Sequence, residues 1–112
     1  MNLESRYDEA IEAYSEAIFC NVPPQQKAIY YSNRSLVSIK TENYALALYD
    51  AEDAIKCDAT FVKAYYRRGS ANLALNQVDK ALKDFQQVCD MQPNNRDAKE
   101  KFEETIKEQK IR

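Results

Sequence analysis

The stretch 44-YALALYDAEDAI-55 and its counterpart 78-VDKALKDFQQVC-89 decide the fold, because both place apolar side chains at the same internal spacing, 34 residues apart. The spacing is that of one face of an amphipathic helix. A third copy of the pattern begins at Tyr7. A fixed period of this length with helical spacing inside it predicts an array of helical repeats. The three apolar stripes are Tyr7, Ala10, Ile11, Tyr14, Ala17, Ile18; Tyr44, Ala47, Leu48, Ala51, Ala54, Ile55; and Val78, Ala81, Leu82, Phe85, Val88, Cys89.

Each repeat unit reads as a pair of helices. Residues 28–61 align with 62–95, and the alignment pairs Tyr31 with Tyr65 and Arg34 with Arg68. Polar turns separate the helices within each unit, and Pro93 ends the last unit because proline cannot continue a helix. The predicted helices of the two units are Gln26–Lys40 and Tyr44–Lys56, with Thr41–Asn43 between them, and Thr60–Leu75 and Val78–Asp90, with Asn76 and Gln77 between them.

The two ends of the array differ from these complete units. Residues 6–20 read as the second helix of a partial first repeat, since only Met1–Ser5 precede them. Pro23 and Pro24 predict an extended connection over Asn21–Lys27. At the other end, 96–112 read as a capping helix that runs to Lys110, with Asn94 as its cap and Ala98, Phe102 and Ile106 as a single apolar stripe.

Composition narrows the classes of function. The chain of 112 residues has 16 basic and 18 acidic residues, which argues against a nucleic-acid or membrane partner. It has no histidine and one glycine, so we expect no catalytic residues, no metal site, no cofactor and no enzymatic activity from this chain alone. Cys20, Cys57 and Cys89 are odd in number and widely spaced, which predicts reduced thiols. We expect a cytoplasmic protein that is also compatible with the nucleus.

The spacing of small and aromatic residues resembles the tetratricopeptide repeat. The third unit matches the family pattern throughout, whereas the second departs from it at one aromatic position, Ala51, and at the proline position, Ala59. The resemblance implies an all-α, right-handed superhelix of antiparallel helix pairs with a capping helix and an incomplete first repeat. The matching residues of the two units are Tyr65, Gly69, Ala81, Phe85, Val88 and Pro93, and Tyr31, Ser35, Ala47 and Ala54.

By the same resemblance, the first helix of each pair lines a concave groove. Asn33, Lys63 and Arg67 match the last three members of the five-residue carboxylate clamp of chaperone-binding tetratricopeptide domains. An amide, a lysine and an arginine suit the carboxylates of an acidic peptide C-terminus. The clamp's other lysine and asparagine belong on the first helix of the first repeat, which this chain lacks. The predicted groove-lining residues are Leu36, Ile39, Lys40, Ser70 and Leu73.

The stretches KTENYALALYDAEDAI, VKAYYRRGSANLAL and NNRDAKEKFEE are most similar to the amino-terminal domain of type 5 serine/threonine protein phosphatases. This resemblance implies binding to the acidic tail of a ninety-kilodalton heat-shock chaperone and a phosphatase catalytic domain in the parent chain. The alternative is a scaffold of another co-chaperone or assembly factor, in which Leu36, Ile39 and Leu73 would hold a different peptide or helix. The apolar face of residues 6–20 lacks one packing partner, so we also expect this helix either to fray or to mediate self-association.

Overall fold

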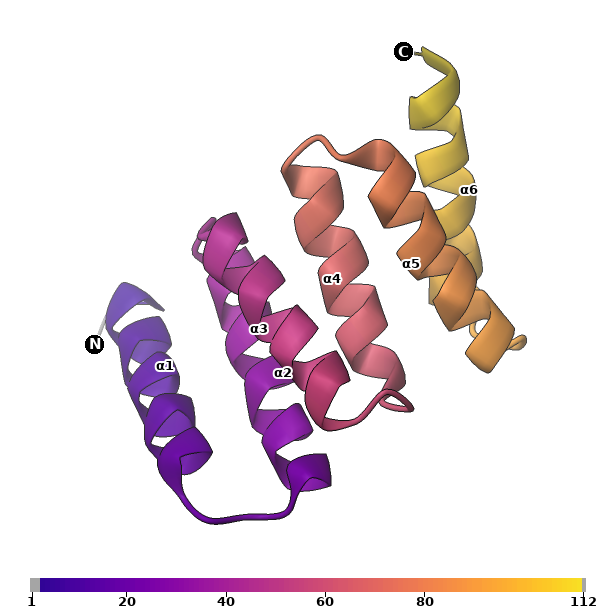
Figure 1. Cartoon of the computed structure of the whole chain (residues 1–112). Coiled ribbons are helices and arrows are strands. Elements are labelled where there is room, and N and C mark those ends of the chain that lie inside the picture. The colour runs from indigo at the N-terminus through magenta and orange to yellow at the C-terminus, as the bar shows by residue number, and fades with distance from the viewer. Residues whose placement is uncertain (1–2, 112) are drawn as a thin grey trace.

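The computed structural model describes residues 3–111, which form six α-helices joined by short turns. Consecutive helices run in opposite directions, and each packs on its neighbour in the chain (Figure 1). The all-α repeat array predicted from the apolar stripes is therefore confirmed. The helices are α1 (Leu3–Phe19), α2 (Pro24–Lys40), α3 (Tyr44–Cys57), α4 (Val62–Ala74), α5 (Val78–Met91) and α6 (Arg96–Ile111).

Small residues form most of the core. An alanine side chain lets two helix axes approach closely, and the remaining space is filled by a few larger groups such as Phe85 and Val88. Ala10 and Ala17, which occupy the same stripe positions in α1, remain half-exposed because α1 packs mainly on α2. The fully buried alanines are Ala28, Ala47, Ala51, Ala54, Ala64, Ala71, Ala81 and Ala98.

Local hydrogen bonds and backbone preferences place several helix ends differently from the sequence prediction. Helix α2 begins at Pro24 rather than Gln26, because a proline at the first helical position has no N–H to leave unpaired. Helix α4 begins at Val62 rather than Thr60, because the backbone N–H and hydroxyl of Thr60 both donate to Asp58 Oδ1, at 3.0 and 2.6 Å. These two bonds fix a turn and lower the pKa of the Asp58 carboxyl.

The capping helix also starts differently. Asn95, not Asn94, caps α6, since its Oδ1 accepts a hydrogen bond from the backbone N–H of Ala98 at 3.0 Å. Thr105 is fully buried beside the predicted stripe and donates to the carbonyl of Lys101, while Phe102 and Ile106 are only half-buried. Within residues 3–111, none of the helices has both the length and the hydrophobicity needed to cross a lipid bilayer.

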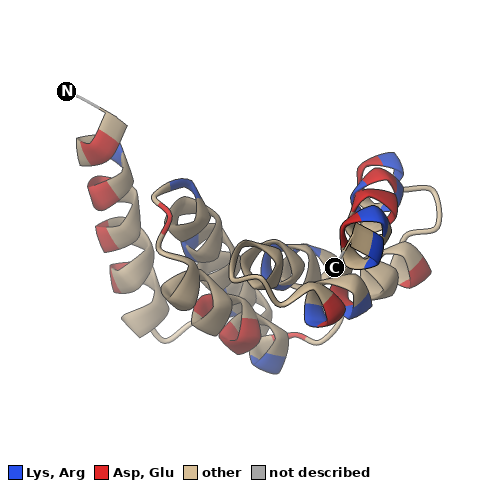
Figure 2. Ribbon diagram, turned by 90° about the horizontal axis from the view of Figure 1, so that it is seen from above, with Lys and Arg blue, Asp and Glu red and all other residues tan. Residues whose placement is uncertain are grey.

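The array curves toward the side of α2 and α4. These two helices contact each other directly, although α3 lies between them in the chain, whereas α3 and α5 do not pack together to the same extent. Seen from above, the helices follow an arc from the N-terminal to the C-terminal end (Figure 2). The first helices of the complete pairs therefore line the inner side, in the arrangement that the family resemblance implied.

Candidate peptide-binding groove

The repeat register places Asn33 and Arg67 at equivalent positions of α2 and α4. They are 34 residues apart, which is one repeat period, and both are half-exposed. Within the described residues, the Asn33 side chain makes no hydrogen bond, so both its amide group and its carbonyl oxygen are available to a ligand. Two neighbouring inner helices thus present a free amide and a guanidinium at matching heights.

Lys63 and Arg67 lie one helical turn apart on α4 and share a cleft of about 300 Å³ with the end of α5 and the start of α6. Lys63 is exposed and forms no ion pair with any other residue of 3–111. The cleft therefore offers an ammonium group that is free to bind a carboxylate. Its lining residues are Val62, Lys63, Tyr66, Arg67, Val88, Gln92, Asn95 and Asp97.

The Arg67 guanidinium is held in place without a charged partner. Its Cζ lies 5.9 Å from the centre of the Tyr66 ring, and that ring packs edge-on against Phe85 with centroids 5.5 Å apart. Arg67 Nε is buried and has no hydrogen-bond partner in the described part of the chain. Burial lowers the pKa of the Arg67 side chain, although an arginine remains charged in proteins. A buried donor without a partner is costly, and an incoming carboxylate or carbonyl oxygen would satisfy it.

Neither Asn33 nor any of the five predicted groove-lining residues lines this cleft. Leu36, Ile39, Ser70 and Leu73 are half-exposed on α2 and α4. Lys40 is exposed at the end of α2 and lines a separate cleft with the start of α1, beside Tyr7. The structure therefore brings Lys63 and Arg67 together but places Lys40 with the N-terminal helix.

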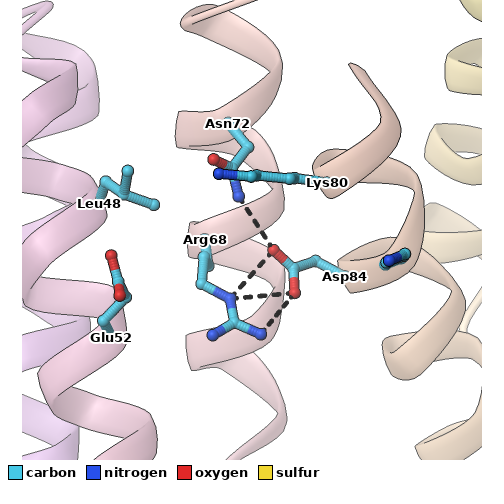
Figure 3. A pocket seen from close by; sticks show the side chains of 7 residues that line it. Leu48, Glu52, Arg68, Asn72, Lys80 and Asp84 are labelled. Atoms are coloured by element: carbon cyan, nitrogen blue, oxygen red, sulfur yellow. Dashed lines mark hydrogen bonds and ion pairs between the residues drawn. The ribbon is translucent and has the colours of Figure 1, made fainter. Parts of the chain in front are cut away.

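Two arginine–aspartate pairs were not identified as pairs from the sequence. Arg34 donates two hydrogen bonds to Asp50, of 2.8 and 2.7 Å. One period later, Arg68 donates three to Asp84, of 2.8 to 3.1 Å (Figure 3). These hydrogen bonds raise the pKa of both arginines. The 34-residue alignment of both residue types was the available signal. Because each pair joins the two helices of one unit, we assign these arginines to the fold rather than to the groove.

Comparison with known proteins identifies the family. The family model for the tetratricopeptide repeat matches residues 62–95. The second such domain of human RPAP3, solved in complex with the HSP70 peptide SGPTIEEVD, is 30% identical with a TM-score of 0.83, and the match covers 92% of this chain and 83% of that domain. The chain belongs to the tetratricopeptide repeat family. The family model has the same limits as the predicted third repeat.

Two further relatives bear on the function of this tetratricopeptide domain. The first such domain of Spaghetti (RPAP3), bound to the HSP90 peptide SRMEEVD, is 29% identical with a TM-score of 0.85, and the match covers 93% of this chain and 80% of that one. Serine/threonine-protein phosphatase 5 of Rattus norvegicus is 46% identical over 101 residues, which are 90% of this chain. The chain spans about a fifth of the length of this phosphatase relative, so the comparison concerns one domain of that protein.

Proposed function

We propose that this tetratricopeptide domain binds the acidic C-terminal tail of a heat-shock chaperone of the ninety-kilodalton class through the carboxylates of the tail. The observation that favours this function is the pairing of Lys63, which has no ion-pair partner among the described residues, with the partly buried Arg67 on one cleft. Asn33 presents a free amide on the preceding inner helix, α2, at the position equivalent to Arg67. The HSP90 and HSP70 peptides held by the two related domains both end in EEVD, which supports an acidic tail as ligand.

We further propose that the parent protein joins this domain to a serine/threonine phosphatase catalytic domain. The similarity to phosphatase 5 over 90% of the chain supports this proposal. The domain would then act as the targeting part of the protein and bring the phosphatase to chaperone-bound substrates. Sequencing the natural transcript around this segment tests the proposal, because a phosphatase catalytic sequence should adjoin it.

Calorimetric titration of the domain with SRMEEVD tests the binding mode. The peptide with a free C-terminus should bind, and the amidated peptide should bind more weakly by about 1.5–3 kcal/mol, since a charge-assisted hydrogen bond to the terminal carboxylate is lost. Binding should also weaken with added salt, because partly exposed charges are screened. Equal affinity for the two peptides would exclude recognition of the terminal carboxylate.

Variants then assign the binding to the cleft. Lys63→Ala should reduce the affinity for SRMEEVD and leave helicity unchanged, because Lys63 is exposed and makes no ion pair within residues 3–111. Lys80→Ala is the matched control, because Lys80 is also exposed but lines the cleft shown in Figure 3, between α3, α4 and α5. Equal effects of both variants would mean that only the net charge matters. That outcome would contradict the assignment of tail binding to the cleft of Lys63 and Arg67.

A further inference from the structure

The cleft that holds Lys63 and Arg67 is also lined by one carboxylate, that of Asp97. Asp97, on the first turn of α6, lines the cleft and is exposed. It forms no ion pair with any other residue between 3 and 111. The cleft thus carries positive charge on α4 and negative charge on α6.

The other polar groups on the α6 side are already engaged. Asn95 Nδ2 donates to Gln92 Oε1 at 2.9 Å, and Asn95 Oδ1 accepts the capping bond from Ala98. Asp97 therefore offers the negative charge at this end. Burial raises the pKa of the Tyr66 hydroxyl, and the charge of Asp97 raises it further, which is consistent with a carboxylate that faces the cleft.

Glu104, two turns further along α6, differs from Asp97 in two respects. Its Oε2 lies 3.9 Å from Lys101 Nζ, so the negative charge of Glu104 is partly neutralised. It does not line the cleft, although its charge makes a smaller contribution to the raised pKa of Tyr66. Asp97 is therefore the acidic group that a ligand in the cleft would meet, and Glu104 provides a matched control on the same helix.

The size of the cleft fits the spacing of residues in a tail peptide. Lys63, Arg67 and Asp97 line one cleft of about 300 Å³. An extended chain advances about 3.3–3.6 Å per residue, so two residues advance about 7 Å. When the two glutamates of the tail, two and three positions before its C-terminal residue, pair with Lys63 and Arg67, the residue two positions further upstream comes within reach of Asp97 in the same cleft.

We propose that Asp97 determines specificity by pairing with a basic side chain five residues before the ligand's C-terminal residue. This inference rests on the proposed function. In SRMEEVD that residue is arginine, whereas in SGPTIEEVD it is threonine. The domain therefore favours tails of the SRMEEVD type, because an arginine can form a charge-assisted bond to Asp97 that a threonine cannot form with equal strength.

A double-mutant cycle between protein and peptide tests the pairing. The folded domain and its variants Asp97→Asn and Glu104→Gln are titrated with SRMEEVD and with SAMEEVD, in which the arginine is replaced. Asp97→Asn should weaken binding of SRMEEVD about two- to fivefold more than binding of SAMEEVD, the range of a solvent-exposed ion pair. Glu104→Gln should change the affinities for both peptides equally. Asp97→Lys should in turn favour SEMEEVD over SRMEEVD.

The outcomes separate this inference from the function on which it rests. If SRMEEVD binds with a free C-terminus but Asp97→Asn weakens both peptides equally, the pairing with Asp97 is wrong and tail binding stands. If neither peptide binds the unmodified domain, both proposals fail. Equal coupling of Asp97 and Glu104 to the peptide arginine would also overturn the inference, because it would indicate a diffuse field of α6 rather than a contact.

Discussion

At the scale of single residues, the two complete repeats fill the same space with different side chains. Gly69 lies against Phe85 in the third repeat, where an added Cβ would lie only 2.7 Å from Phe85 Cε1. One period earlier, the corresponding residues are Ser35 and Ala51, both fully buried. A larger residue on the first helix thus accompanies a smaller one on the second, which preserves the volume between the helices.

This exchange predicts the effect of enlarging Gly69. Gly69→Ala should destabilise the domain by about 1–2 kcal/mol, because overpacking against Phe85 costs about 1–3 kcal/mol and the higher helix propensity of alanine recovers up to about 1. The double variant Gly69→Ala/Phe85→Leu should lose less unfolding free energy than the two single variants lose together. Urea unfolding followed by circular dichroism measures all three variants. A Gly69→Ala variant with an unchanged or higher midpoint would show that Phe85 can move aside.

The arginine–aspartate pairs also act at the scale of single residues, because they join the two helices of each repeat. Asp50 and Asp84 are almost completely buried, which an unpaired carboxylate would not tolerate. Burial of the aspartate on the second helix of each unit therefore depends on pairing with an arginine from the first helix. Arg34 also donates to Ser15 Oγ at 2.9 Å, which ties α1 to the first complete pair.

At the scale of elements, α2 and α4 end in the same way. The N–H of Glu42 donates to the Ile39 carbonyl and that of Asn43 to the Ser38 carbonyl, and the same two bonds recur around Asn76. This pattern is a Schellman motif, which needs a left-handed residue just after the helix. Glu42 has φ 62° and Asn76 has φ 66°. Asparagine tolerates this conformation better than glutamate does.

Glycine substitutions at these two positions should therefore differ. Glu42→Gly should stabilise the domain by about 0.5–1 kcal/mol, because it removes the left-handed strain and the gain exceeds the added freedom of the unfolded chain. Asn76→Gly, the matched control, should have a smaller effect or none. Thermal unfolding of both variants against the parent measures the difference. A destabilised Glu42→Gly variant would mean that the glutamate side chain makes a contribution that outweighs its backbone strain.

At the scale of the whole molecule, α1 is the least covered helix. None of the residues of Leu3–Phe19 is buried, whereas the stripe alanines of α3 are fully buried. Ala47 in α3 is completely inaccessible, while its counterpart Ala10 is half-exposed. Helix α3 packs on both α2 and α4, but α1 packs mainly on α2. A face with this pattern retains apolar surface that a second copy could cover.

We propose self-association through this face, as the sequence predicted for residues 6–20. The sedimentation coefficient should rise with protein concentration, and Ala10→Glu should suppress the rise because it places a charge on the apolar stripe. Ala13→Glu is the control, since Ala13 is exposed on the same helix outside the stripe. A sedimentation coefficient independent of concentration would contradict the proposal, as would equal effects of the two substitutions.

The sequence by itself determined the class of fold, the six helices to within a few residues, and the shared face of Lys63 and Arg67. These features depend on the helical period and on the 34-residue repeat, and both periods can be read directly from the sequence. The starts of α2, α4 and α6 differ from the sequence prediction, since Pro24, Thr60 and Asn95 act through local bonds and backbone preferences that compete with the apolar pattern.

Only the tertiary structure decided which charges meet. It buries Asp50 and Asp84 against arginines, places Lys40 beside α1, and brings Asp97 to the cleft of Lys63 and Arg67. The helical period fixes which residues share a face of one helix, but it does not say which other helix that face meets. That choice depends on how the helices pack in space, both neighbours in the chain, such as α2 on α3, and helices that are not neighbours, such as α2 on α4.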